Sequence, residues 1–257
     1  MSPAEHSVKN SGDATSGAQL DSANQLLNHL NPEELGRLAP QLEKVPLNFK
    51  QVLWEPGDRV EWAYFVETGV VSLITVVDGS DTVETGTIGN EGMVGLGGFL
   101  GNDRAQEQAI CQIAGSARRI GIEELREERR QGKQLSDLLL RYTSAMMKMF
   151  AQTAACNRLH PVEERMSRWL LMTLDRVGTT NFPLTQEFLA TMLGVRRPTV
   201  NIAGATLQKA GLIRYSRGKI TVLDRAGLES ASCECYAQIR AEFELALGNG
   251  SQGSAGG

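Results

Sequence analysis

Residues 184–211 read LTQEFLATMLGVRRPTVNIAGATLQKAG, and this stretch decides the fold of the C-terminal part of the chain. Thr185 is an N-cap candidate for a first short helix with one apolar face. Gly194 supplies the left-handed residue that ends this helix. Pro198 lies in the first turn of a second helix, which ends at Gly211. Two short helices joined by a glycine-containing turn form a helix-turn-helix.

The second helix carries side chains that suit the major groove of DNA. Val200, Ala203 and Leu207 are spaced to face inward. The side chains left outside are Arg197, Thr199, Asn201, Ile202 and Gln208. Arginine can hold guanine with two hydrogen bonds, asparagine can do the same for adenine, and isoleucine can contact a thymine methyl group. The pattern therefore predicts sequence-specific binding to double-stranded DNA.

A basic hairpin follows the two helices. It reads LIRY, then Ser216-Arg217-Gly218, then KITVLD, and we expect it to form a wing that touches phosphate. An ordinary helical hairpin is the alternative, and the second arginine at Arg196 together with the wing disfavours it. The predicted DNA-binding residues are Thr185, Arg196, Arg197, Pro198, Thr199, Asn201, Ile202, Gln208, Arg217 and Lys219.

Charged side chains are distributed unevenly along the chain, and the basic ones are concentrated in the region predicted to bind DNA. The formal net charge of the 257 residues is −4. Residues 1–120 hold 8 basic against 16 acidic side chains, whereas residues 158–220 hold 10 basic against 4 acidic ones. A compact basic segment is what binding to a polyanion requires, because each Lys or Arg placed against a phosphate releases condensed counterions.

The region from Val45 to Ile122 has a different pattern. Short β-branched runs alternate with turn signals at Pro56-Gly57-Asp58, Gly69, Asp78-Gly79 and Gly89-Asn90-Glu91-Gly92. Such spacing predicts an antiparallel sandwich or barrel, with a hairpin at Asp78-Gly79. A short helical stretch with Asn31 as N-cap precedes it.

A long amphipathic helix follows the β-rich region. Its apolar or small residues recur at alternating steps of 4 and 3, which is the spacing of a helix that meets a partner helix. We expect this seam to form a dimer interface; the alternative is that it packs on the chain's own β-rich part. The seam consists of Leu135, Leu139, Tyr142, Met146, Met149, Thr153 and Cys156. Asn157 to Pro161 then interrupts the helix and predicts a hinge.

In this order and spacing, the segments resemble the Crp/Fnr family of bacterial transcription regulators over roughly residues 25–230. The resemblance implies an α+β fold: an N-terminal antiparallel β-roll (jelly-roll-like), a long dimerisation helix and a C-terminal winged helix-turn-helix. The expected boundaries are 1–20 for a disordered tail, 21–134 for the cyclic-nucleotide-binding-like sensor domain, 135–157 for the dimerisation helix, 158–247 for the DNA-binding domain with a C-terminal helix, and 248–257 for a second disordered tail.

The resemblance also implies an oligomeric state, a DNA target and a protein partner. The expected protein is a cytoplasmic homodimer on a two-fold symmetric operator, with RNA polymerase as a further partner. Arg197 lies where the family has its leading base-contacting arginine. Pro198 stands where the family usually has an acid and Ile202 where it has a later arginine, so the operator sequence is expected to differ. No apolar run is long enough to cross a membrane, and the polar first twenty residues lack a signal-peptide core.

The family's cyclic-nucleotide cassette resembles Glu91 to Leu100 followed by Ala105 to Ile113. Leu96 replaces the glutamate that holds the ribose, and Glu107 or Gln108 replaces the arginine that holds the phosphate. Losing a buried charge-assisted bond costs about 3 kcal/mol, which disfavours cyclic AMP as the effector. Arg104 in a shifted loop could substitute, and a remodelled cyclic-nucleotide receptor is the second functional hypothesis. The pocket candidates are Gly95, Leu96, Gly97, Gly98, Arg104, Glu107 and Gln108.

No cofactor or metal is expected from the remaining motifs. Residues 1–110 contain no cysteine for an iron–sulfur cluster, and the three histidines, His6, His29 and His160, are scattered. Cys233 and Cys235 are expected in one helix opened by Asp224, where residues two apart face away from each other. Cys111 and Cys156 are read as core residues, with redox sensing as an alternative. No H-E-x-x-H, G-x-S-x-G or P-loop motif points to an enzyme.

Overall fold

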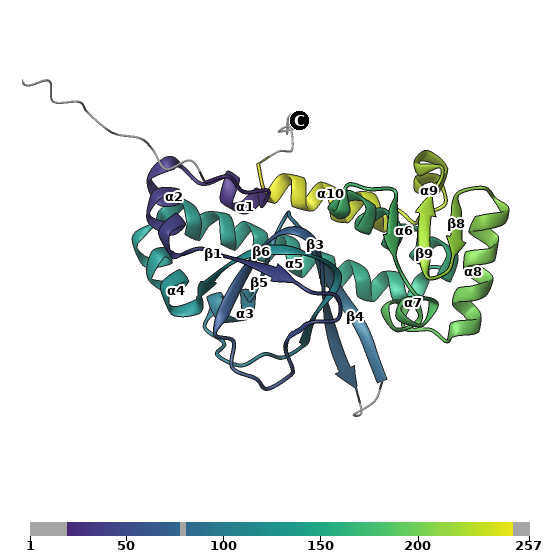
Figure 1. The fold of residues 1–257 in the computed structure, drawn as a ribbon, viewed down its shortest axis with the longest axis horizontal. Coiled ribbons are helices and arrows are strands. Elements are labelled where there is room, and N and C mark those ends of the chain that lie inside the picture. Colours follow the sequence, from purple (N-terminus) through teal and green to yellow (C-terminus); the bar gives the residue numbers. More distant parts are fainter. Residues whose placement is uncertain (1–19, 78–80, 249–257) are drawn as a thin grey trace, which may run out of the picture.

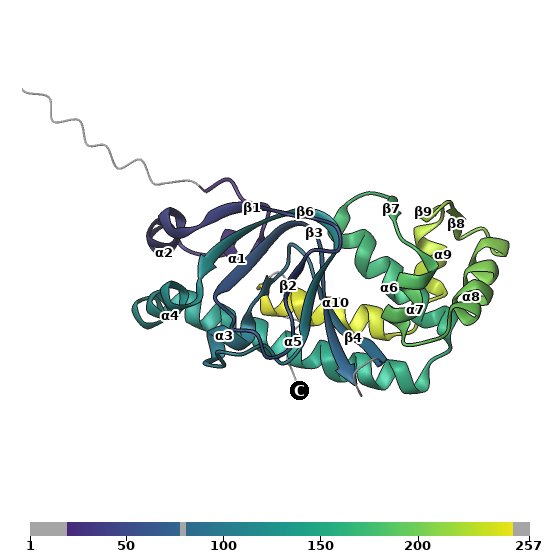
Figure 2. The ribbon, with the colours of Figure 1, turned by 60° about the horizontal axis from the view of Figure 1, so that its bottom comes forward.

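The computed structural model describes residues 20–77 and 81–248. The Asp78-Gly79 turn and nearly all of both expected tails lie outside these residues. Figure 1 shows a sheet-rich part with helices at one end of the molecule and a helical part with a small sheet at the other. Helix α5 (Lys133–Leu159) runs along the sheet-rich part towards the helical part, and the two views agree on this course (Figures 1 and 2). The α+β architecture expected from the sequence is confirmed.

The larger sheet has six strands, all paired in the antiparallel sense. Its main path is β1-β6-β3-β4, with β2 paired to β6 and β5 paired to β3. The strand bounds are β1 (Glu43–Leu47), β2 (Val52–Trp54), β3 (Trp62–Val77), β4 (Asp81–Ile88), β5 (Met93–Val94) and β6 (Gln108–Gly121). Their inward residues form one core with α5 and the N-terminal helices.

Gly69 does not separate two strands, as its turn-like context suggested. It lies inside the single strand β3, where the register against β6 shifts on both sides of it. Its φ is 85°, and an added Cβ would lie 2.4 Å from the carbonyl oxygen of Ile113. The strand therefore bulges at Gly69 and continues, because only glycine allows this conformation and this close approach.

Short helices cover the end of the sheet. They are α1 (Gln25–Asn28), α2 (Pro32–Leu38), the 3-10 turn η1 (Ala39–Gln41), α3 (Leu96–Leu100) and α4 (Ile122–Gln131). Asn31 caps α2, since its side-chain oxygen accepts a 2.8 Å hydrogen bond from the backbone nitrogen of Glu34. The N-cap expected at Asn31 is thus confirmed.

The apolar seam of α5 is buried within one chain, which corrects its assignment as a dimer interface. All seven side chains are at most 7% exposed, and the hydroxyl of Tyr142 donates to the carbonyl oxygen of Met93 on β5. The seam packs on the chain's own sheet and C-terminal helix, so it offers no surface to a partner. The corrected residues are Leu135, Leu139, Tyr142, Met146, Met149, Thr153 and Cys156.

The break expected before Pro161 is present. Helix α5 ends at Leu159, His160 is extended, and α6 (Val162–Val177) begins after Pro161. Helix α6 then returns to the sheet: the Arg176 guanidinium forms a 2.7 Å ion pair with Glu91, and both side chains are largely buried. The Arg176 guanidinium also donates hydrogen bonds to the side-chain hydroxyl and the backbone carbonyl oxygen of Thr87. These contacts fix the C-terminal part against β4.

The C-terminal part contains a second, three-stranded sheet of order β7-β9-β8. Its elements are β7 (Asn181–Pro183), α7 (Gln186–Leu193), α8 (Arg197–Lys209), β8 (Ile213–Ser216), β9 (Lys219–Val222), α9 (Arg225–Ser230) and α10 (Cys235–Ala246). Helix α10 lies beside α5 in both views (Figures 1 and 2), with the rings of Tyr142 and Phe243 6.0 Å apart. In the described residues, no helix is both long and apolar enough to cross a membrane.

Candidate nucleic-acid interface

Helices α7 and α8 form the helix-turn-helix expected from the sequence. The Thr185 hydroxyl caps α7 by accepting a 3.1 Å hydrogen bond from the backbone nitrogen of Phe188. Gly194 ends α7 with a φ of 59°, and α8 begins at Arg197 with Pro198 in its first turn. The turn between the helices has only three residues, Gly194 to Arg196, because the left-handed glycine ends α7 sharply.

The two faces of α8 differ as predicted. Val200, Ala203 and Leu207 are at most 3% exposed and belong to the core of the winged part. On the other face Ile202 is 65% exposed, and Arg197 and Asn201 are also exposed. An apolar side chain this accessible beside arginine and asparagine matches the mixture of contacts that base edges and thymine methyl groups accept.

Two of the residues predicted to bind DNA, Thr185 and Gln208, use side-chain groups for hydrogen bonds inside the domain. Thr185 caps α7 with its hydroxyl. The side-chain oxygen of Gln208 accepts a 2.8 Å hydrogen bond from the backbone nitrogen of Tyr215, which ties α8 to β8. The Tyr215 hydroxyl in turn donates to the carbonyl oxygen of Leu184. Gln208 therefore holds the wing in position, and its amide nitrogen is the group left to face outward.

The wing is built on β8 and β9. Arg217 lies in the turn between them with a φ of 50°, and Gly218 follows at 74°. Arg214 opposes Thr221, and Ser216 opposes Lys219, so alternate residues bring Arg214 and Lys219 to one face with the Arg217 turn at its end. Arg214 is not among the residues predicted from the sequence, although it alternates along β8 with Ile213, which is buried, and Tyr215, which is half-buried.

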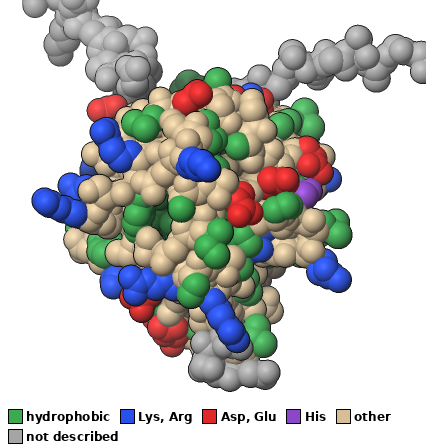
Figure 3. Space-filling model, turned by 90° about the vertical axis from the view of Figure 1, so that its right-hand side faces the viewer, with side chains coloured by type: hydrophobic (Ala, Val, Ile, Leu, Met, Phe, Trp, Pro, Cys, Tyr) green, Lys and Arg blue, Asp and Glu red, His purple; other side chains and the backbone are tan. Residues whose placement is uncertain are grey.

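The basic side chains of this region are unpaired. In the described residues, Arg196, Arg197, Arg214, Arg217 and Lys219 are all exposed, and none forms an ion pair with a carboxylate. Figure 3 views the molecule from the end that carries the winged part, and Lys and Arg side chains project at several places on this face. Exposed cations without acidic partners are available for phosphate.

A cavity of about 670 Å³ lies between α5 and the larger sheet. Four of the seven pocket candidates line it: Gly95, Leu96, Gly97 and Glu107. The other three do not. Gly98 packs on Ile122, the Arg104 guanidinium donates to the carbonyl oxygen of Gly57 at 2.7 Å, and Gln108 donates to the carboxylate of Glu55. Arg104 therefore does not replace the missing phosphate ligand from a shifted loop in this structure.

The charged side chains at the cavity are both acidic. Burial raises the pKa of Glu84 to about 7, against hydrogen bonds from Ser72 and Trp169 that lower it. Burial also raises the pKa of Glu107. Among the described residues, no Lys or Arg lines this cavity, and its remaining lining is largely apolar. Such a site is unsuited to a phosphate anion, because the carboxyl groups repel it when they are ionised and no lining cation offsets the cost of desolvation.

Cys233 and Cys235 do not lie in one helix opened by Asp224, as the sequence predicts. Helix α9, which Asp224 does cap, already ends at Ser230. Cys233 lies in the irregular segment that follows, and Cys235 opens α10. The premise that both lie in one helix and face apart is therefore wrong. They meet Cys156 and His160 from the end of α5.

Comparison with known proteins agrees with this geometry. Residues 164–231 match the Crp-like helix-turn-helix domain. FixK2 from Bradyrhizobium japonicum has a TM-score of 0.65 at 16% identity, covering 75% of this chain and 98% of its own. A putative Crp/Fnr regulator from Eubacterium rectale has 0.63 at 18%, covering 80% and 96%. The c-di-GMP-responsive global regulator CLP of Xanthomonas campestris has 0.59 at 18%, covering 76% and 100%.

No curated protein matches the chain in sequence. The fold and the matched domain nevertheless define the class: a DNA-binding transcription regulator with a winged helix-turn-helix. The helix-turn-helix match over residues 164–231 and the fold shared with solved Crp/Fnr-type regulators agree with the Crp/Fnr resemblance of the sequence.

Proposed function

We propose that the chain acts as a homodimer on a two-fold symmetric operator, with α8 in the major groove. The observation that carries this proposal is the exposed face of α8. A helix that buries Val200, Ala203 and Leu207 while it exposes Arg197, Asn201 and a 65% exposed Ile202 has a surface suited to base edges. Two such helices related by a dimer axis enter successive major grooves, about 10–11 bp apart.

Each exposed residue has an expected role in this proposal. Arg197, Asn201 and Ile202 contact bases, and Thr199 and Pro198 lie beside them in the first turns of α8. Arg196, which precedes α8, contacts phosphate in this proposal, as do Arg217 and Lys219 on the wing; all three side chains are exposed. Arg214 joins this phosphate group because it shares a face with Lys219. Phosphate contacts fix the position of the protein, and base contacts select the sequence.

The dimer uses another face of α5 than the buried seam. Leu140 is 46% exposed and Met147 is 67% exposed. Together with four neighbours they recur at alternating steps of 3 and 4, displaced by one residue from the buried seam. Two copies of this stripe form a coiled-coil contact. The proposed stripe consists of Leu140, Thr143, Met147, Phe150, Ala154 and Asn157.

The proposed stripe also borders the cavity that faces the sheet. Thr143, Met147 and Phe150 line both, so a partner helix on the stripe would close the open side of the cavity. A ligand in the cavity would then contact the dimer interface and could shift the population of dimer states. Because the cavity offers carboxyl groups and apolar walls, we propose that its effector is not cyclic AMP.

The remaining features of the proposal follow from DNA binding. A protein that binds an operator works where the chromosome is, so we place it in the bacterial cytoplasm, with RNA polymerase as its partner in transcription. No catalytic role is proposed. The described residues show no nucleophile paired with an activating base at this interface.

In vitro selection from random DNA by the purified chain tests the proposal. We expect a two-fold symmetric site with half-sites about 10–11 bp apart, enriched equally with and without cyclic AMP. An asymmetric site would contradict the dimer geometry. Enrichment that appears only with cyclic AMP would contradict the assignment of the cavity.

A further inference from the structure

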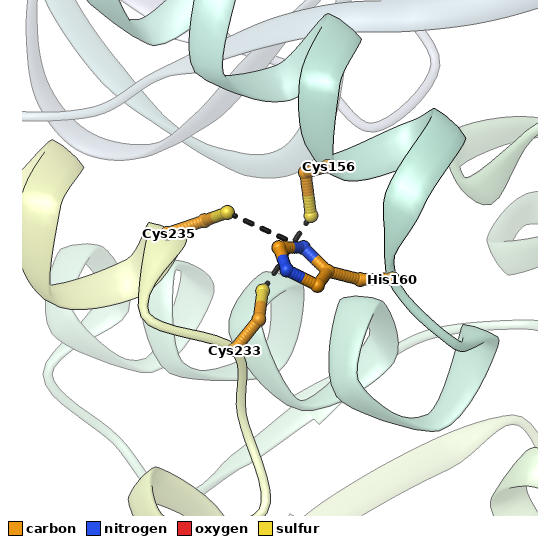
Figure 4. A group of neighbouring side chains, drawn as sticks. All are labelled: Cys156, His160, Cys233 and Cys235. Atoms are coloured by element: carbon orange, nitrogen blue, oxygen red, sulfur yellow. Dashed lines mark hydrogen bonds between the residues drawn. The ribbon is translucent and has the colours of Figure 1, made fainter.

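Four metal-binding side chains meet at the junction between the sheet-rich part and the winged part. They are Cys156, His160, Cys233 and Cys235, and their ligand atoms all lie within 4.8 Å of one another. Figure 4 shows the three thiols and the imidazole converging from two segments of the chain. Cys156 and His160 come from the end of α5, and Cys233 and Cys235 come from the segment that opens α10.

The spacing of the ligand atoms suits one tetrahedral ion. Zinc–sulfur bonds of about 2.3 Å and zinc–nitrogen bonds of about 2.0–2.1 Å require edges of roughly 3.8 Å between sulfurs and roughly 3.6 Å between sulfur and nitrogen. The Sγ atoms of Cys156 and Cys233 are 3.5 Å apart, and Cys235 Sγ is 3.5 Å from Nδ1 of His160. An iron–sulfur cluster has several irons and sulfides between its ligands, which atoms this close cannot enclose.

The surroundings orient these ligands. His160 turns Nδ1 towards Cys235, while its Nε2 lies 3.4 Å from a carboxylate oxygen of Glu234. A histidine that donates its second nitrogen to a carboxylate is the usual arrangement at a zinc ion, because this contact fixes the ring and its tautomer. Gln152 adds a 3.1 Å hydrogen bond from Nε2 to the Cys235 sulfur.

Two buried arginines supply an independent argument from charge. Arg165 is 6% exposed and Arg168 is 5% exposed, and in the described residues neither pairs with a carboxylate. Within the described part of the chain, the Nε atom of each has no hydrogen-bond partner, and the groups that do donate reach the carbonyl oxygen of Leu193 and the sulfur of Met172 rather than a carboxylate. Burial lowers the pKa of the Arg165 guanidinium, and Cys156 and Cys233 in their thiolate form oppose this shift. Buried cations require nearby negative charge, and three thiolates around a divalent ion leave one net negative charge.

We infer that Cys156, His160, Cys233 and Cys235 form a structural zinc site. This inference goes beyond the proposed DNA-binding function and does not depend on it. All four tetrahedral positions are filled by protein ligands, as in structural rather than catalytic sites. The ion joins the end of α5 to the start of α10 beside the break at Pro161, so it fixes the junction from which α6 and the winged part extend.

The donor set favours zinc over other ions. Three thiolates and one imidazole in a tetrahedron suit Zn²⁺, whereas Mg²⁺ and Ca²⁺ prefer oxygen ligands in larger shells. A disulfide between Cys156 and Cys233 is the competing chemistry, since their sulfurs are neighbours. The zinc site and the disulfide can be distinguished by experiment. A zinc site needs reduced thiols and retains the metal, whereas a disulfide removes two of the four ligands.

Metal analysis of the full chain tests the inference. Protein purified under reducing conditions without chelator is analysed for zinc by mass spectrometry, against protein concentration from amino-acid analysis. We expect one zinc per chain in the wild type and in Cys111→Ser, a matched control that alters a buried cysteine on β6 outside the cluster. We expect loss of zinc in Cys156→Ser and Cys233→Ser.

Cobalt substitution gives a second reading that needs no variant, so it decides even where a serine variant does not fold. Wild-type chain stripped by chelator and titrated with Co²⁺ should develop the strong visible absorption of tetrahedral cobalt–thiolate, complete at one equivalent and displaced by Zn²⁺. Chelator should lower the Tm of wild type and Cys111→Ser alike, because the metal binds only the folded state.

Several results would overturn the zinc assignment. Wild-type protein that contains no zinc and gives only the weak spectrum of octahedral cobalt would do so. Equal zinc content in wild type, Cys156→Ser and Cys233→Ser would place the metal elsewhere. A Cys156–Cys233 disulfide in the peptide map of metal-free native protein would show that the cluster is oxidised instead.

Discussion

The indole nitrogen of Trp169 donates a 2.9 Å hydrogen bond to the carboxylate of Glu84, and both side chains are buried. Trp169 belongs to α6 and Glu84 to β4, so this bond joins the winged part to the sheet. Arg176, two turns further along α6, adds the ion pair with Glu91. Because Glu84 also lines the cavity, the cavity and the position of the winged part share one side chain.

A proton on Glu84 gives a consistent set of hydrogen bonds with Ser72 and Gln112. The Ser72 hydroxyl lies within hydrogen-bond distance of both Glu84 and Gln112 but has only one proton to donate. When Glu84 is protonated, it donates to Ser72, and Ser72 donates to Gln112. This arrangement agrees with the pKa of about 7 that burial produces.

Glu84→Gln should stabilise the protein at pH 8. The pKa of Glu84 rises from 4.5 in its ordinary state to about 7 in the folded protein. The folded state therefore binds the proton more tightly than the unfolded state, and wild-type stability falls as pH rises from about 4.5 to 7. The glutamine variant lacks this loss, which is on the order of 3 kcal/mol. Urea unfolding at pH 5 and pH 8 measures the difference.

The matched control for this prediction is Glu61→Gln, which alters an exposed carboxylate. It should follow the wild-type pH profile. If Glu84→Gln showed the same fall in stability between pH 5 and pH 8 as the wild type, Glu84 would not be the group that takes up the proton.

Charges on the exposed stripe of α5 should separate the dimer. The double variant Leu140→Asp, Met147→Asp places like charges opposite each other across the proposed contact, which is costly without partners. Sedimentation should show folded monomers, with operator binding weakened. Leu159→Asp is the control, since Leu159 is 73% exposed on the same helix but lies off the stripe.

Leu139→Asp should behave differently from the stripe variant. Leu139 is fully buried in the chain's own core, so a charge there should lower the Tm of the fold itself. A stripe variant that stays dimeric at micromolar concentration would refute the stripe as the interface.

Lys219→Ala should weaken all DNA sequences about equally. Lys219 lies on the wing, is exposed and has no acidic partner in the part of the chain that the structure describes, so its expected contact is a phosphate. The slope of log K against log salt should become shallower by about one unit. Lys148→Ala, an exposed lysine on α5, should leave the slope unchanged. Selective loss of operator binding in Lys219→Ala would instead indicate a base contact.

The winged part was predictable because its signals are local. Thr185 caps α7, Gly194 ends it and Pro198 lies in the first turn of α8, and the structure confirms each of these local roles. The periodicity of α5 was recognised too, but α5 has two apolar stripes one residue apart. Periodicity identifies an apolar stripe, but it does not show whether that stripe packs inside the chain or against a second copy. For this reason the sequence predicts Leu139 at the dimer interface and gives no role to Leu140.

The cysteine cluster was not predictable in the same way. Cys156 and Cys233 are 77 residues apart, and only the return of α10 along α5 brings them together. The Asp224 cap predicts a helix that continues over Cys233, whereas the chain bends after Ser230. Helix ends are set by tertiary packing as well as by capping residues, and here the bend aims both thiols at His160.

Binding of Arg197→Ala to the selected operator and to random DNA, at one salt concentration, tests the central claim most directly. If α8 reads bases through Arg197, the variant loses about 1–3 kcal/mol on the operator while binding to random DNA changes much less. The preference for the operator then disappears. Equal losses on both DNAs would show that Arg197 contacts only phosphate and would contradict the placement of α8 in the major groove.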